Sequence, residues 1–250
     1  MITIEEQQAD GTLLYGWKSE PPLTPVAPSY AHYLTEKKIF SKEECEEWFV
    51  YLLEQEPILL NKFRTSIADG GTGLGATAIT ARYQHFNLLN FDFHLIPKLK
   101  THILKGVEDI LRISGNANWQ ETLYANCWFN VLRQGEEMQG HFHGYHKCIF
   151  YGFHVNISAK ETFTTYYHPV KFQDEAFFVP NQPGHLTLFP DFIPHSVTVN
   201  KYNVPRISIA GDIFSSTWLD EEATPGFKRN VDNKNLVKIG TCNRKKDKIL

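Results

Sequence analysis

Histidines crowd into one short stretch of the chain, where residues 140–146 read Gly-His-Phe-His-Gly-Tyr-His just before a β-rich run. If this stretch is extended, residues i and i+2 project from one face, so His141 and His143 can reach a single point while Phe142 faces away. Imidazole sets bind Zn, Fe, Cu or Ni, and residue type alone does not choose among them. The spacing therefore predicts a metal site that includes His141 and His143.

A third ligand has to come from a neighbouring strand, and His195 opens one directly after Pro194. For a histidine that stands alone, a place in the core or at the surface is the commoner explanation. We apply that interpretation to the histidines without further support, which are His146, His154, His168 and His185. The acids Asp191 and Glu137 are interpreted as solvated loop residues.

Arg206 lies eleven positions after His195, in the run Arg-Ile-Ser-Ile-Ala-Gly-Asp that ends at Asp212. A strand that starts at His195 runs inward and turns near residues 202–203. Arg206 then begins the returning strand, deep inside the β-barrel that we predict below from the strand pattern, with Ser208 on the same face. Because a guanidinium stays charged and binds a carboxylate through two hydrogen bonds, Arg206 with a hydroxyl one pleat away predicts a carboxylate receptor.

Two amphipathic segments precede these residues. Ser41 begins a capping box with Glu44, and apolar residues follow at helical spacing, which predicts a helix over about 42–55. A second helical pattern runs over 95–111 and stops at Gly115. The segment 69–77 between them is rich in glycine and lacks the Lys-Ser/Thr pair of a phosphate-binding loop, so we expect a mobile loop that serves as a lid.

From about residue 121 the chain consists of short β-rich runs, many separated by glycine or proline. The predicted strands are 123–131, 147–157, 163–168, 176–179, 185–189, 196–199 and 207–214. Short strands without a helical period between them favour a sandwich or barrel over alternating β-α-β units. The expected fold class is mainly β, a double-stranded β-helix of the jelly-roll or cupin-like type, with the preceding helices packed outside.

The ends of the chain are expected to differ from this core. Residues 1–30 are predicted to be an irregular lead-in because of their prolines, Pro21, Pro22, Pro25 and Pro28. A single domain is expected over 31–216, with its barrel core at about 121–214. Residues 217–250 are expected to be a solvated extension, with docking onto the domain or onto a partner as the alternative. Its last basic residues are Arg244, Lys245, Lys246 and Lys248.

Composition excludes several classes of protein. The 250 residues are 42% hydrophobic, which is enough for a sizeable core. The 25 Lys+Arg nearly balance the 28 Asp+Glu, so the net charge creates no electrostatic field that would attract nucleic acid or a membrane surface. The cysteines are scattered and are expected to be reduced thiols: Cys45, Cys127, Cys148 and Cys242. No signal-like start and no long apolar run are present, so we expect a cytoplasmic protein without nucleic-acid or membrane partners.

The order of the site residues resembles the Fe(II)/2-oxoglutarate-dependent dioxygenases, whose signature is His-x-acid, a distal histidine and then an arginine. Here His141-Phe142-His143 is followed after 52 positions by His195, then by Arg206. Segment 39–48 is similar to the helix that introduces prolyl-hydroxylase-type members, and 184–190 is similar to the strand before their distal histidine. The H-x-H motif is similar to that of a narrower group within the superfamily. The likeness covers about 39–56 and 121–214.

This resemblance implies the cofactors. Fe(II) would be held by His141 and His195, and 2-oxoglutarate would chelate it, with O2 as co-substrate and with succinate and CO2 as products. Arg206 and Ser208 would hold the distal carboxylate of 2-oxoglutarate. Asn130, on the first barrel strand, is a further candidate contact to the co-substrate.

The third metal ligand stays open at this point, because His143 stands where the family has an acid. Three candidates are open for that position: His143 as a third imidazole, water or substrate, and the carboxylate of Asp212 from its own strand. The substrate is equally open between a peptide or protein and a small molecule, and the sequence predicts no oligomeric state. Two other functions compete: a three-histidine cupin-type dioxygenase that does not use 2-oxoglutarate, and a non-catalytic jelly-roll binding protein.

Overall fold

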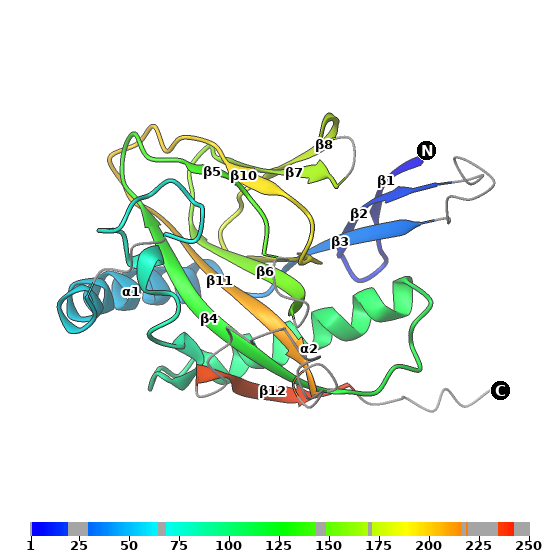
Figure 1. The fold of residues 1–250 in the computed structure, drawn as a ribbon, viewed down its shortest axis with the longest axis horizontal. Helices are drawn as coiled ribbons and strands as arrows, with labels where there is room; N and C mark the ends of the chain where they lie inside the picture. Colours follow the sequence, from blue (N-terminus) through cyan, green and yellow to red (C-terminus); the bar gives the residue numbers. More distant parts are fainter. Residues whose placement is uncertain are drawn as a thin grey trace, which may run out of the picture.

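The computed structural model describes residues 2–19, 30–64, 69–143, 149–169, 172–216, 219 and 235–242. Several predictions fall outside these ranges: those on Cys148, on His146, on the four early prolines and on the basic end after residue 242. The described residues form two antiparallel sheets and two α-helices (Figure 1). The mainly β fold class is therefore confirmed.

The larger sheet has eight strands in the order β1-β2-β3-β9-β6-β11-β4-β12, and the smaller has four in the order β5-β10-β7-β8. In Figure 1 the smaller sheet lies above strands β6, β11 and β4 of the larger one, and α2 lies below these strands. The larger sheet contains β1 (Ile2–Gln7), β2 (Leu13–Lys18), β3 (Ala31–Lys38), β9 (His185–Pro190), β6 (Ile149–Ser158), β11 (Arg206–Ser215), β4 (Thr122–Leu132) and β12 (Val237–Thr241). The smaller contains β5 (Met138–His141), β10 (His195–Val197), β7 (Phe163–His168) and β8 (Phe172–Pro180).

Both predicted helices are confirmed. Helix α1 spans Lys42–Lys62 and starts with the expected capping box, in which the Ser41 hydroxyl accepts from the Glu44 amide and the Glu44 carboxylate accepts from the Ser41 amide. It runs past the predicted end and includes Pro57. Helix α2 spans Ile96–Ile113, and short 3-10 turns at Ile79–Arg82 and Leu88–Asn90 lie between the two helices. Among the described helices none is both long and apolar enough to span a bilayer.

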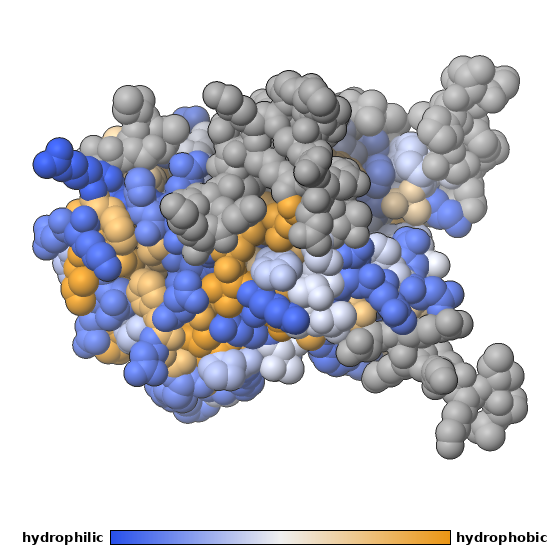
Figure 2. All heavy atoms as spheres, turned by 60° about the horizontal axis from the view of Figure 1, so that its bottom comes forward, coloured by the Kyte–Doolittle hydropathy of each residue, from blue (hydrophilic) through white to orange (hydrophobic). Residues whose placement is uncertain are grey.

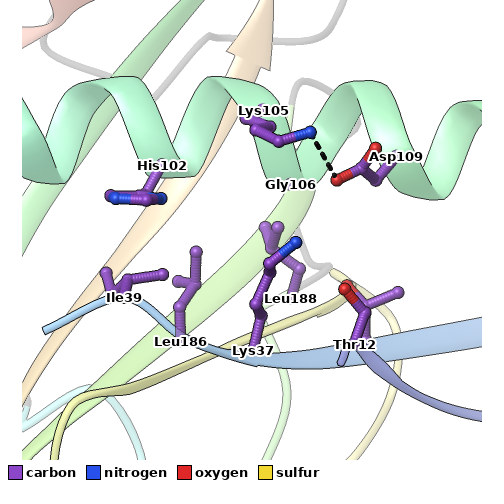
Figure 3. A pocket seen from close by; sticks show the side chains of 10 residues that line it. Thr12, Lys37, Ile39, His102, Lys105, Gly106, Asp109, Leu186 and Leu188 are labelled. Atoms are coloured by element: carbon purple, nitrogen blue, oxygen red, sulfur yellow. Dashed lines mark hydrogen bonds and ion pairs between the residues drawn. The ribbon is translucent and has the colours of Figure 1, made fainter. Parts of the chain in front are cut away.

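Helix α2 packs closely on the outer face of the larger sheet. A Cβ on Gly106 would lie 2.2 Å from Leu188 Cδ1, so only glycine allows this approach. Beside it a cavity of about 20 Å³ is lined by Lys37, His102 and Asp109, among others (Figure 3), which is room for about one water molecule. The strand residues that line the cavity face α2, and strand residues alternate between the two faces of a sheet. The sheet therefore separates this cavity from the barrel interior.

The outer surface of α2 carries charges that pair along the helix. Asp109 lies 3.3 Å from Lys105 and 3.2 Å from Arg112, in the i,i+4 and i,i+3 positions. Figure 2, which brings the underside of Figure 1 forward, shows apolar residues in the middle of this face with hydrophilic residues around them. The described surface on this side is therefore mixed in polarity.

The prediction of an irregular lead-in is wrong for residues 2–18. Strands β1 and β2 form a hairpin that continues through β3 into the larger sheet, and Gly11 takes a φ of 81° in the connecting turn. Trp17 on β2 is almost completely buried, so the hairpin contributes to the core. The four prolines weighed against these strands all follow residue 19, beyond the end of β2.

The C-terminal extension is not wholly solvated either. Strand β12 pairs antiparallel with β4, and Ile239 and Cys242 are buried there. The alternative of docking therefore applies to residues 237–242. The predicted barrel strands are all present within the described ranges, with altered ends, whereas β1, β2, β3, β5 and β12 are strands that the sequence did not predict.

Candidate metal centre

Two neighbouring strands of the smaller sheet bring the histidines together. His141 ends β5 and His195 opens β10, and the two are directly paired across the antiparallel ladder. His143 follows β5 by two residues, and its backbone amide donates to the Asp191 carbonyl at 3.0 Å. One ring nitrogen from each of His141, His143 and His195 lies within 4.8 Å of the others, so the three can hold one metal ion.

The hydrogen bonds of the rings fix their tautomers. His141 and His195 each place Nδ1 against the backbone carbonyl two residues earlier, at 2.8 and 3.1 Å, and His143 places Nδ1 2.6 Å from the Asp212 carboxylate. Carbonyl and carboxylate oxygens only accept, so each Nδ1 carries the proton and donates it. Each Nε2 then keeps its lone pair, which is the arrangement that metal-binding histidines adopt.

Burial keeps the rings of His141 and His195 neutral. Desolvation, reinforced by His143, lowers the pKa of His141 to about 4, and burial with the neighbouring imidazoles holds the pKa of His195 well below its usual value. His195 is fully buried, and its Nε2 has no hydrogen-bond partner within the described chain. A buried nitrogen without a partner is costly unless something binds it, and a metal ion fits that position.

A polar pocket deeper in the barrel surrounds Arg206, which is 2% exposed. Its Nη2 donates to Asn156 Oδ1 at 2.9 Å and its Nη1 to Ser208 Oγ at 3.4 Å, while Nε has no partner. Burial lowers the pKa of Arg206 to about 10, which still leaves it charged at neutral pH. No ion pair to Arg206 exists among the described residues, so this buried cation lacks a counter-ion and fits an anionic ligand.

Asn130 belongs to the same pocket. Its Nδ2 donates to Ser208 Oγ at 3.4 Å, and its Oδ1 accepts from the Thr80 hydroxyl at 2.8 Å. Asn130 faces Ser208 directly across the β4–β11 ladder, which explains their contact. The three residues expected to hold a co-substrate, Arg206, Ser208 and Asn130, therefore form one hydrogen-bonded group.

Comparisons with known proteins show similarity in structure. No family model matches the chain, and no curated protein is similar to it in sequence. The α-ketoglutarate-dependent non-heme epimerase SnoN of nogalamycin biosynthesis aligns at a TM-score of 0.50 and 15% identity, over 78% of this chain and 86% of its own. This chain has the fold of the Fe(II)/2-oxoglutarate oxygenases.

Two prolyl hydroxylases align more weakly with this oxygenase fold. The enzyme of Trichoplax adhaerens gives a TM-score of 0.45 and 12% identity over 76% of this chain and 87% of its own. The prolyl-4-hydroxylase of Pseudomonas putida gives a TM-score of 0.34 and 15% identity over 44% of this chain, which spans 63% of that enzyme. These scores are too low to compare the structures in detail.

Asp212 lies within the barrel but outside the group of three ligand atoms. On β11 it is paired with Asn126 of β4 and Gly152 of β6, and its carboxylate contacts His143. A Cβ on Gly152 would lie 3.2 Å from His143 Nδ1 and 2.6 Å from Phe189, so glycine makes room for this contact. The sequence placed Asp212 near the mouth as an alternative ligand; the structure places it against His143.

His154 is the neighbour of the metal centre that sequence reasoning set aside. It lies on β6, with its ring centroid 4.9 Å from that of His195 and its Nδ1 3.3 Å from the Tyr166 hydroxyl. Burial holds its pKa well below the usual value. It is a buried, hydrogen-bonded histidine, as expected, but it packs against a candidate ligand. The position of His154 beside His195 depends on the pairing of β6 with β9 and β11, and no local sequence motif indicates it.

Two other histidines that were set aside, His168 and His185, have partners of their own. His185 Nδ1 lies 2.9 Å from the buried Glu36 carboxylate, and His168 is buried with its Nε2 3.1 Å from the Tyr30 hydroxyl. Glu137 is exposed, as predicted. The prediction for Asp191 is wrong: it is partly buried, and burial raises its pKa to about 6.

The glycine-rich segment 69–77 lies beside the metal centre. The Asp69 carboxylate accepts from the amides of Gly71 and Gly75, both at 3.0 Å. The segment joins β5 through the Gln139 amide, which donates to the Thr72 carbonyl at 2.8 Å. Its position at the edge of the site suits a lid, and the carboxylate of Asp69 holds its turns together.

Proposed function

We propose that this protein is an Fe(II)- and 2-oxoglutarate-dependent dioxygenase that hydroxylates a C–H bond of a peptide, a protein or a small molecule. The observation that carries the proposal is the combination of a three-histidine cluster with a buried arginine that has no counter-ion among the described residues. The first suits a divalent metal and the second suits the distal carboxylate of 2-oxoglutarate. SnoN, which shares the fold, is described as α-ketoglutarate-dependent.

Each residue has a defined task in this proposal. His141, His143 and His195 offer Nε2 lone pairs to Fe(II), and their Nδ1 hydrogen bonds keep the rings from turning. Arg206 and Ser208 bind the distal carboxylate of 2-oxoglutarate, and this contact would supply the missing partner of the guanidinium.

Fe(II) with bound 2-oxoglutarate and O2 supplies the oxidising chemistry, and the co-substrate leaves as succinate and CO2. The protein's own contribution is orientation and the exclusion of water. Phe189 and Trp128 lie with their ring centroids 5.6 and 6.1 Å from that of His143, so apolar surface borders the centre. Asn130, held by Thr80, keeps the Ser208 hydroxyl in place.

One observation favours a second candidate, a cupin-type dioxygenase that does not need 2-oxoglutarate. All three side chains of the cluster are imidazoles, and no carboxylate of the described residues joins them. The buried Arg206 pocket argues against this candidate, since an enzyme without an anionic co-substrate has no use for an unpaired buried cation. A non-catalytic jelly-roll binding protein would need neither feature.

Electron paramagnetic resonance separates the three candidates. The protein is loaded with Fe(II) and nitric oxide, and spectra are compared with and without 2-oxoglutarate. We expect a high-spin Fe–NO signal whose shape changes when 2-oxoglutarate is added, together with slow succinate release in air. A signal that ignores 2-oxoglutarate would support the cupin-type enzyme, and the absence of any bound iron would exclude both enzymes.

A further inference from the structure

The pair His143–Asp212 differs from the other ligand contacts in charge. The rings of His141 and His195 donate to neutral backbone carbonyls, whereas His143 donates to a carboxylate at 2.6 Å. The two side chains are only 8% and 11% exposed, so little water screens them from each other. A charged hydrogen bond of this length in a nearly dry site is a strong one.

We propose that Asp212 is a positioning residue that supplies negative charge to the metal centre through the imidazole of His143. This inference rests on the proposed function for the presence of the metal. Three neutral imidazoles leave the full charge of a divalent ion uncompensated. A carboxylate that accepts the Nδ1 proton makes the ring a better electron donor at Nε2 and fixes its orientation.

The larger sheet fixes Asp212 in a position beside the ring of His143. It lies on β11 between Asn126 and Gly152, and strand pairing on both sides fixes its backbone. Glycine at position 152 leaves the space that the His143 ring occupies. The carboxylate is thus one imidazole away from the point at which the three ligand nitrogens converge.

A substitution of His143 also changes the surroundings of Asp212. His143→Asp alone places a carboxylate next to the metal but leaves Asp212 buried without its donor, and a buried unpaired charge is costly. The double variant His143→Asp with Asp212→Asn removes that penalty. We therefore expect the metal-free double variant to melt at a higher temperature than metal-free His143→Asp alone.

Titration of metal-free, full-length protein with Co(II), followed by visible absorption, tests the proposal without reference to turnover. Asp212→Asn keeps an acceptor for Nδ1 but removes the charge, and Asp212→Ala removes both. We expect a loss of Co(II) affinity of about 10-fold for the first and up to about 100-fold for the second. Asp191→Asn is the matched control, since it removes a nearby carboxylate that does not contact His143 through its side chain, and its affinity should stay within about 2-fold of wild type.

Each result decides one question. Unchanged Co(II) affinity in both Asp212 variants, with wild-type melting temperatures, would overturn the proposal, as would loss of binding in Asp212→Ala with none in His143→Ala, because Asp212 would then be a ligand itself. Equal losses in Asp191→Asn and Asp212→Asn would also overturn it and would indicate a general charge effect. Failure of wild-type protein to bind Co(II) at all would instead contradict the proposed function.

Discussion

Arg206 shows how burial turns one side chain into a receptor. Its guanidinium is satisfied only in part by Asn156 and Ser208, and Nε points to no acceptor among the residues described. We expect Arg206→Ala to weaken 2-oxoglutarate binding by at least about 10-fold, because charge-assisted hydrogen bonds are lost. Co(II) affinity should stay nearly unchanged, since no metal ligand is removed. Isothermal titration with each ligand measures both, and Arg206→Lys is the control that keeps the charge without the fork.

The buried ring of His141 makes the stability of the metal-free protein depend on pH. Desolvation lowers the pKa of His141 to about 4, whereas an unfolded chain has the ordinary value near 6.5. Between these values the unfolded chain binds more protons than the folded one, so stability rises with pH through this window and falls on acidification. Urea unfolding at pH 7 and pH 5 checks this, and His141→Ala should reduce the difference. A metal-free protein that is equally stable at both values would contradict the expectation.

For single residues, the sequence predicts which side chains form the candidate site better than it predicts the contacts between them. The i, i+2 spacing of His141 and His143 is a local rule, and the structure brings these two residues together with His195 as it requires. The predicted return from His195 to Arg206 is different in the structure, because β10 lies in the smaller sheet and β11 in the larger one. The contact between His143 and Asp212 joins residues 69 positions apart. It depends on the register of β11, which no local pattern determines.

Strand β12 is the element whose importance the sequence concealed. It covers the edge of β4 and buries Ile239 and Cys242, and a Cβ on Gly240 would lie 2.4 Å from Leu104 of α2. We expect a chain that ends after residue 234 to melt several degrees lower, since each kcal/mol is worth about 2–4 °C in a domain of this size. A chain that ends after residue 242 keeps β12 and should melt like the full protein. Differential scanning calorimetry compares them, and equal melting of the shorter chain would show that β12 adds no stability.

Other elements were missed for related reasons. The hairpin β1–β2 is short and lies just before a proline-rich segment, so its own strand pattern was outweighed by its neighbours. Strand β5 contains Met-Gln-Gly-His, which has no strong β propensity, and it forms because β10 pairs with it. Both helices, in contrast, follow from capping and periodicity within a single segment.

The metal centre brings together residues from parts of the chain that are distant in sequence. His141 and His195 come from two strands of the smaller sheet, and Asp212 behind His143 comes from the larger one. A metal ion bound there would link β5 to β10 directly and would reach the larger sheet through the hydrogen bond from His143 to Asp212, and the unfolded chain has no such preformed site. Metal binding should therefore stabilise the entire domain and not only the strands that carry the ligands.

Thermal unfolding with and without Co(II) tests this coupling. At 100 times its dissociation constant, a ligand of the folded state adds about 2.7 kcal/mol, which corresponds to a rise of about 5–10 °C in melting temperature for a chain of this size. Addition of 2-oxoglutarate should raise the melting temperature further, but only when Co(II) is present, because chelation to the metal provides part of its binding. His195→Ala removes the ligand with the buried, unpartnered Nε2 and should abolish both shifts. An equal rise with 2-oxoglutarate in metal-free protein would mean that the Arg206 pocket binds it without help from the metal.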